Sequence, residues 1–235
     1  MAIADEIRAA VGTVFGLGPL ARDLPREARV GGLVFHPLVG AAIGGIAAAA
    51  AALTAPLGTL PAAVAAVAVL AGASGGATLR DLLGCRRATA QGAPPLPAGL
   101  ALAAVVVLGK LWAVCRLPAS GRTIALVLAA MLGRWAVVVQ CHGGRPVAGR
   151  RPGDDLVGRA RLREFGWAST IAFGTTLAAL DAVGLVVLLA ATLTTVGVRV
   201  AAYRRAGGLD APLLGVSLEL VEAAVLVVLA ALARG

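Results

Sequence analysis

The chain has 235 residues, of which 59% are hydrophobic and only 14% are charged, and its mean hydropathy is +0.90. A composition this apolar excludes a soluble globular domain and a disordered tail, and it predicts an all-α, polytopic bundle of transmembrane helices. The formal net charge of +9 would suit a nucleic-acid-binding protein, but the arginines are distributed between apolar stretches, so no nucleic-acid partner is expected.

The N-terminal segment, residues 1–30, carries too many charges to cross a membrane. Ile3, Ile7 and Val14 recur within it at helical spacing, which predicts a helix over residues 2–15 that lies in the membrane interface. A cleavable signal peptide is the competing interpretation. Two acidic residues stand where its basic region is expected, and they argue against it.

The rest of the chain, residues 31–235, is expected to form a single polytopic membrane domain. Its apolar stretches have about the length of the ~20 residues that a helix needs to cross hydrocarbon. They cover residues 31–53, 57–76, 98–115, 123–140, 166–180, 183–200 and 212–232. The fifth and sixth are separated only by Asp181 and Ala182, which predicts a tight helical hairpin. About six to seven spans are therefore expected.

The basic residues give the expected orientation. Sixteen of the 21 fall in the N-terminal segment and in the loops after the second, fourth and sixth stretches, whereas the alternate loops hold three. The positive-inside rule then predicts an integral membrane protein with its N-terminus inside. Membrane lipids are the first expected partners, and the sequence does not fix an oligomeric state.

Charged residues within the predicted spans are candidates for function, because a charge in lipid is costly unless it faces the bundle interior. They are Lys110, Arg134, Glu219 and Glu222, together with Asp181 at the predicted hairpin. The two glutamates lie three positions apart and share a helix face. This allows either a joint cation site or ion pairs to Lys110 or Arg134, and the sequence leaves both open.

Two pairs of glycines and one arginine-rich loop are candidate anion sites. Gly75-Gly76 and Gly207-Gly208 could let backbone amides approach a ligand, although a helix stop or a close helix crossing is the favoured interpretation of each pair. Loop 145–163 could hold a phosphate or diphosphate. Its composition favours the binding of anionic lipid headgroups instead.

Three elements, in order along the chain, resemble the cobalamin-5'-phosphate synthase family, also called adenosylcobinamide-GDP ribazoletransferases. They are the run Val34-Phe35-His36-Pro37-Leu38-Val39-Gly40, the pair Gly75-Gly76 with its polar loop, and Gly207-Gly208 followed by Leu214-Gly215 and Glu219-Leu220-Val221-Glu222. The resemblance implies a transferase of the plasma (inner) membrane that acts in the last steps of cobalamin biosynthesis. Its substrates would be the corrinoid nucleotide adenosylcobinamide-GDP and alpha-ribazole or its 5'-phosphate, with GMP released and Mg²⁺ as cofactor.

The resemblance also implies roles for residues of this chain. The implied catalytic residues are Asp81, Arg80 and Arg134; the substrate-binding residues are Gly75, Gly76, Arg86, Arg87, Gly207 and Gly208; and the metal ligands are Asp81, Asp210, Glu219 and Glu222. Where the family has an acidic run after its paired glycines, this sequence keeps only Asp81. The alternative is a non-catalytic membrane homologue that binds a corrinoid intermediate or a pathway partner.

Overall fold

In the computed structural model the chain forms an α-helical bundle, and the predicted fold class is confirmed. The structure describes residues 3–14, 23–73, 76–84, 96–147 and 156–233. Within these ranges only two isolated bridges, and no strand, accompany the helices. The helices are α1 (Ile3–Val14), α3 (Arg26–Gly31), η1 (Gly32–Phe35), α4 (His36–Thr54), η2 (Ala55–Leu57), α5 (Thr59–Gly72), α6 (Ala77–Gly84), α7 (Leu96–Arg116), α8 (Ala119–Cys141), α9 (Leu162–Leu180), α10 (Ala182–Ala206) and α11 (Ala211–Leu232).

Five segments of the described chain are long and apolar enough to cross a membrane. They are Arg26–Leu57, Gly99–Arg116, Ala119–Cys141, Ala182–Ala206 and Ala211–Leu232. A sixth is counted if α5 and α6, which are bent by 89° to one another, form one broken span. Helix α9, which matches the fifth predicted stretch, is not among them.

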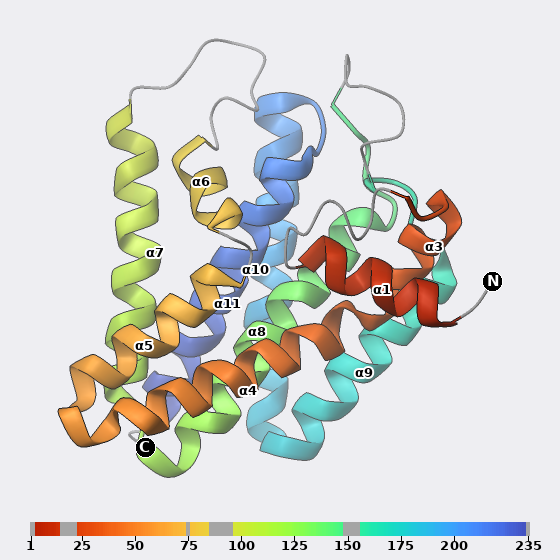
Figure 1. Ribbon diagram of the computed structural model, residues 1–235. Helices are drawn as coiled ribbons and strands as arrows, with labels where there is room; N and C mark the ends of the chain where they lie inside the picture. Colours follow the sequence, from red (N-terminus) through yellow and green to blue (C-terminus); the bar gives the residue numbers. More distant parts are fainter. Residues whose placement is uncertain (1–2, 15–22, 74–75, 85–95, 148–155, 234–235) are drawn as a thin grey trace.

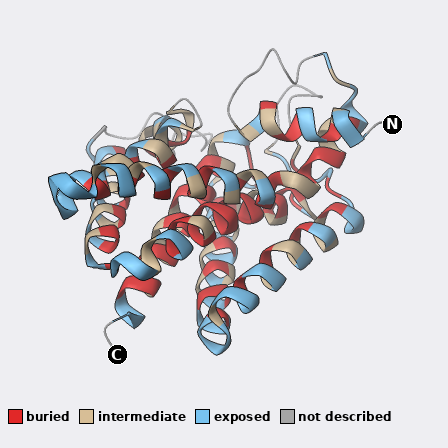
Figure 2. Cartoon of the chain, turned by 60° about the horizontal axis from the view of Figure 1, so that its bottom comes forward, coloured by how far each residue is buried: buried red, intermediate tan, exposed pale blue. Residues whose placement is uncertain are grey.

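The central helices of the bundle are α8 and α11, and α8 packs against both α4 and α11 (Figure 1). Figure 2 shows buried residues concentrated at the centre of the bundle and exposed residues on the outer helices. Two glycines of α4 allow the approach to α8: a Cβ at Gly40 or Gly44 would lie 2.5 Å from the carbonyl oxygen of Ala130 or Leu126. In lipid the hydrophobic effect does not drive helices together, so their association depends on close van der Waals packing. Small residues at the interface allow that close backbone contact.

Residues 77–84 form a helix, where the sequence predicted a polar loop. Helix α5 ends at Gly72, the chain turns through Gly76 at φ +70°, and α6 then lies beside α11. Leu82 explains why this segment folds, because it is fully buried against Val106 and Val216. The bend brings the polar residues of α6 to the central helix α11.

The N-terminal helices cover one end of the bundle. Helix α1 packs against α3, η1 and α4, and it buries Glu6, Ala9 and Ala10 on its inner side. Ile3 and Ile7 remain 67% and 43% exposed. The predicted helix is therefore present, with one face on the protein and isoleucines on its outer face.

The predicted hairpin between α9 and α10 is present. Asp181 alone joins the two helices, and its φ of 48° makes it the one described non-glycine residue with positive φ. At the other end of α10, Gly207 adopts the left-handed conformation at φ 71° and ends the helix. A helix stop was the favoured interpretation of that glycine pair.

Candidate functional site

Four charged side chains meet inside the bundle. The Lys110 ammonium on α7 donates to Glu219 Oε2 and to Glu222 Oε2 of α11, each at 2.5 Å. Arg134 on α8 donates through Nη1 to Glu222 Oε1 and, at 3.2 Å, to the Ala130 carbonyl. All four side chains are at most 2% exposed. Of the two arrangements that the sequence left open, the structure shows the ion pairs.

We refer to Lys110, Arg134, Glu219 and Glu222 as the buried ionic network. It contains two cations and two carboxylates, so its formal charge is zero. Neutrality matters at this depth because removing one member would leave a charge uncompensated in a medium of low dielectric constant. His36, at the start of α4, is 3% exposed and lies within electrostatic reach of Arg134.

Helix α6 connects this network to the surface. Thr78 Oγ1 donates to Glu219 Oε1 at 2.5 Å. One turn later, half-buried Asp81 lies directly against Gly215 of α11. Asp81 interacts electrostatically with Asp210, Glu219 and Arg80, yet it forms no ion pair with a described residue. It is therefore the carboxylate of this site that remains available to a ligand.

The acidic residue at the start of α11 has a structural partner. Asp210 is the N-cap of α11, and its Oδ1 accepts a hydrogen bond from the Leu213 amide at 3.0 Å. Gly208 lies against the backbone of the segment that follows α8, since a Cβ there would come within 2.7 Å of the Arg145 carbonyl oxygen. The second glycine pair thus ends α10 and admits a close backbone contact.

The four acidic residues expected to bind metal do not together fit Mg²⁺. Glu219 and Glu222 give their oxygens to Lys110, Arg134 and Thr78, while Asp210 caps a helix. Across the described ranges, no group of three or more His, Cys, Asp or Glu side chains is arranged to hold a metal ion. Mg²⁺ prefers octahedral oxygen ligands, and Asp81 alone would leave most of that shell to water and substrate.

The remaining expected site residues lie in different environments. Arg80 is exposed on α6, close to Asp81, whereas Arg134 is 1% exposed in the bundle interior. Gly76 forms the turn into α6 and has open space around it. Gly75, Arg86 and Arg87 lie outside the described residues. The structure brings Arg80, Asp81, Asp210 and Glu219 together around the contact of α6 with α11.

Sequence reasoning missed two parts of this polar interior. Thr78 was not singled out, although it stands three positions before Asp81 and so shares its helix face. A second polar cluster, between α8, α10 and α11, centres on Gln140. The Gln140 amide donates to the Thr195 carbonyl at 2.9 Å and to Ser217 Oγ at 3.1 Å, and it accepts from Arg199 Nε at 2.9 Å.

Comparison with known proteins identifies the family. A model of the family described as Cobalamin-5-phosphate synthase matches residues 97–230, which is more than half of the chain. The matched range includes both glutamates, Lys110 and Arg134 of the buried ionic network. No curated protein and no solved structure matched the chain. The chain belongs to the cobalamin-5-phosphate synthase family, whose members are membrane transferases of cobalamin biosynthesis.

Proposed function

We propose that this protein joins adenosylcobinamide-GDP to alpha-ribazole or its 5'-phosphate, with release of GMP. The family match supports the reaction class. The observation that carries the proposal is Asp81, a half-buried carboxylate without an ion pair among the described residues, beside the exposed cation Arg80. A carboxylate next to a guanidinium suits the transfer of a phosphoryl-linked group to a hydroxyl.

Each side chain has a proposed role. Asp81 accepts the proton of the attacking ribazole hydroxyl, which is the work of a general base. Arg80 holds phosphate oxygens of the GDP-activated substrate through its planar guanidinium. Thr78 and the buried ionic network hold α6 against α11 and thereby position Asp81. In this proposal Asp81 is a catalytic residue, and Arg134, which acts through the network, is a positioning residue.

The test is turnover by the purified full-length protein in detergent. The protein is incubated with adenosylcobinamide-GDP and alpha-ribazole, with and without Mg²⁺, and the GMP and the joined corrinoid are measured. We expect wild-type turnover and a loss of about 100-fold or more in Asp81→Asn, as for removal of a general base. Asp181→Asn is the matched control, because it changes an aspartate in the hairpin and Asn tolerates a positive φ.

A magnesium requirement remains a prediction of the family resemblance. If the wild type turns over equally well in excess EDTA, the reaction needs no divalent cation from solution. If turnover appears only with Mg²⁺, the reaction needs the cation, and the substrate phosphates would supply most of its oxygen ligands. Absence of turnover under both conditions would overturn the proposed transferase.

A second candidate is a non-catalytic homologue that binds a corrinoid intermediate or a pathway partner. The observation that favours it is the neutralisation of Glu219 and Glu222 by Lys110 and Arg134, which leaves Asp81 as the one available carboxylate of the site. Saturable binding of adenosylcobinamide-GDP without product, unchanged in Asp81→Asn, would support this candidate against the transferase.

A further inference from the structure

A second polar site lies at the junction of the N-terminal helices with the start of α9. It is a cavity of about 800 Å³ lined by residues of α1, α3 and the segment 158–164. None of its lining residues belongs to the buried ionic network or to α6. Its lining contains four arginines and three glutamates, namely Arg26, Arg159, Arg161 and Arg163 with Glu6, Glu27 and Glu164.

One arginine of the cavity is already neutralised. Arg163 donates through Nη2 to both carboxylate oxygens of Glu6, at 3.2 and 3.3 Å, and its Nε lies 3.8 Å from Glu164 Oε1. The other oxygen of Glu164 accepts the backbone N–H of Arg161 at 2.8 Å. Glu6 and Glu164 thus hold Arg163 and fix the frame of the cavity.

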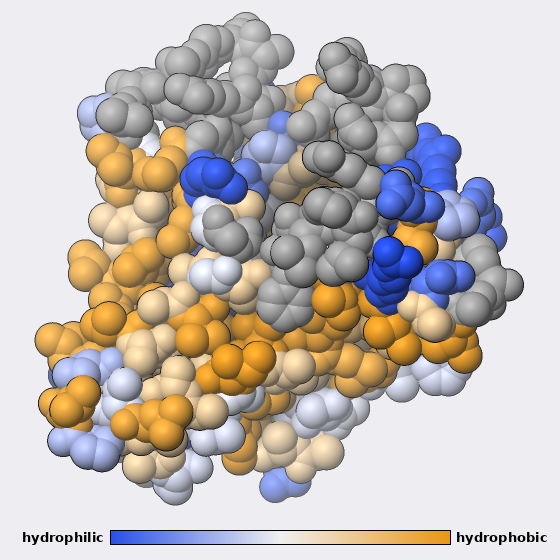
Figure 3. Space-filling view, viewed as in Figure 1, coloured by the Kyte–Doolittle hydropathy of each residue, from blue (hydrophilic) through white to orange (hydrophobic). Residues whose placement is uncertain are grey.

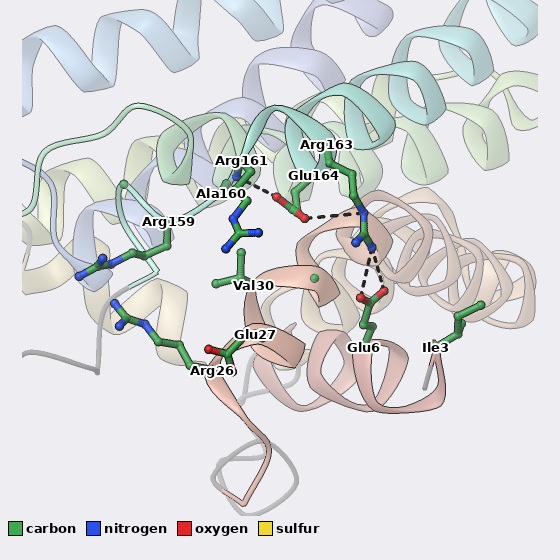
Figure 4. A pocket seen from close by; sticks show the side chains of 12 residues that line it. Ile3, Glu6, Arg26, Glu27, Val30, Arg159, Ala160, Arg161, Arg163 and Glu164 are labelled. Carbon is green, nitrogen blue, oxygen red and sulfur yellow. Dashed lines mark hydrogen bonds and ion pairs between the residues drawn. The ribbon is translucent and has the colours of Figure 1, made fainter. Parts of the chain in front are cut away.

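The other three arginines have no ion pair with any residue that the structure describes. Figure 4 shows the guanidinium groups of Arg26 and Arg159 facing one another and that of Arg161 directed into the space above Val30. Glu27 is the only lining carboxylate left to offset them. All three are exposed, so solvent screens their mutual repulsion, and an anion between them would remove it.

The surroundings of the cavity are apolar. Leu162 and Trp167 on the first turns of α9 are 73% and 59% exposed, and Ile3, which lines the cavity, is 67% exposed. Figure 3 shows hydrophilic side chains gathered over the N-terminal helices directly above a broad hydrophobic surface. Exposed Trp and Ile beside basic residues are typical of the boundary between headgroups and hydrocarbon.

We propose that this cavity binds a phosphate-bearing anion through Arg26, Arg159 and Arg161. The three guanidinium groups supply planar donors to phosphate oxygens, and the lining as a whole, with four arginines against three glutamates, keeps a positive charge that favours an anion. The phosphate can belong to an anionic lipid, whose acyl chains would lie along Ile3, Leu162 and Trp167, or to a soluble phosphorylated compound. The chemistry at the arginines is the same for both sources.

The test compares two probes on the full-length protein in detergent. Phosphatidic acid, with phosphatidylcholine as the neutral lipid, is titrated and followed by native mass spectrometry, and inorganic pyrophosphate is titrated by calorimetry. The pocket variant is Arg26→Gln/Arg159→Gln/Arg161→Gln. The control is Arg8→Gln/Arg204→Gln/Arg205→Gln, which removes the same charge from exposed positions outside the cavity.

We expect the pocket variant to lose at least about tenfold in affinity, since a charge-assisted hydrogen bond contributes about that factor, while the control keeps wild-type affinity. If the pocket variant loses affinity for phosphatidic acid, the cavity is a lipid site. If it loses affinity for pyrophosphate alone, the ligand is a soluble phosphorylated compound. Equal affinity of the wild type and the pocket variant for both probes, or an equal loss in the control, would overturn the proposal. Glu27→Gln is a second variant that does not depend on correct folding of the triple variant. It removes a negative charge from the lining, so it should tighten anion binding about threefold, and unchanged affinity would also overturn the proposal.

Discussion

The Asp81 side chain on α6 lies against the Cα of Gly215 on α11, so closely that a side chain at position 215 would displace it. A Cβ at this glycine would overlap Asp81 Oδ2 and would lie 3.0 and 3.1 Å from its Cγ and Cβ atoms. The whole carboxylate side chain would have to move. Gly215 therefore fixes where the proposed catalytic carboxylate lies.

The first prediction follows from this contact. Gly215→Ala should displace Asp81 and lower turnover to nearly the level of Asp81→Asn, while the melting temperature falls only slightly, because Asp81 is half-buried and can rotate away. Gly197→Ala on α10 is the control, since a Cβ there meets nothing within 4 Å. Wild-type turnover in Gly215→Ala would show that the placement of Asp81 against α11 has no part in activity.

The second prediction concerns the neutrality of the buried ionic network. Arg134→Leu leaves Glu222 with only Lys110 and gives the network a net negative charge, so it should destabilise the protein by about 3–5 kcal/mol. Arg134→Leu/Glu222→Gln restores neutrality and should recover part of that loss. Reversible unfolding in mixed micelles measures both variants.

A conservative variant separates charge from packing in the same measurement. Arg134→Lys keeps the charge but loses the planar donor to the Ala130 carbonyl, so it should be more stable than Arg134→Leu. If the single and the double variants unfold at the same denaturant concentration, the ion pair does not contribute to stability.

The sequence predicted most of the fold because lipid leaves the backbone few options. Each apolar stretch had to be a helix, and the hairpin at Asp181 followed from two residues between two stretches. The bend after α5 was not predictable in the same way. Its cause is tertiary, since α6 forms where Leu82 and Thr78 find partners on α7 and α11, and hydropathy along the chain does not register such contacts.

For the site, the sequence identified Lys110, Arg134 and the two glutamates as unusual but could not choose between a metal site and ion pairs. Spacing puts Glu219 and Glu222 on one face of α11, yet their partners come from α7 and α8, more than eighty residues away in the sequence. The choice depended on how the helices pack. The cavity at Arg26, Arg159 and Arg161 likewise joins segments far apart in the chain.

The third prediction tests the close crossing of α4 over α8. Gly44→Val should destabilise the protein by about 3 kcal/mol, because its Cβ would press on the backbone of Leu126 and Val127, which cannot rotate away. Gly45→Ala is the neighbouring control. It meets open space and should be neutral or stabilising by about 0.5–1 kcal/mol, since Ala favours a helix over Gly. Thermal unfolding in one detergent compares them, and equal melting temperatures would contradict the crossing.

The fourth prediction is the orientation of the chain in the membrane. In a background without native cysteines, Ser120→Cys in the first turn of α8 should react with an impermeant maleimide from outside intact cells. Arg205→Cys at the end of α10 should react only after permeabilisation, because the loops rich in arginine are expected inside. Both positions are exposed. The reverse pattern of labelling would invert the orientation.

The buried ionic network also has a consequence for how the protein is made. Its two cations lie on α7 and α8, and both its carboxylates lie on α11, which leaves the ribosome after those two helices. Lys110 and Arg134 therefore enter the membrane before their counterions exist, at a cost of up to about 3 kcal/mol each on insertion scales. Insertion of α11 removes this cost. A chain that stalls before residue 219 keeps two uncompensated charges in its membrane-spanning helices.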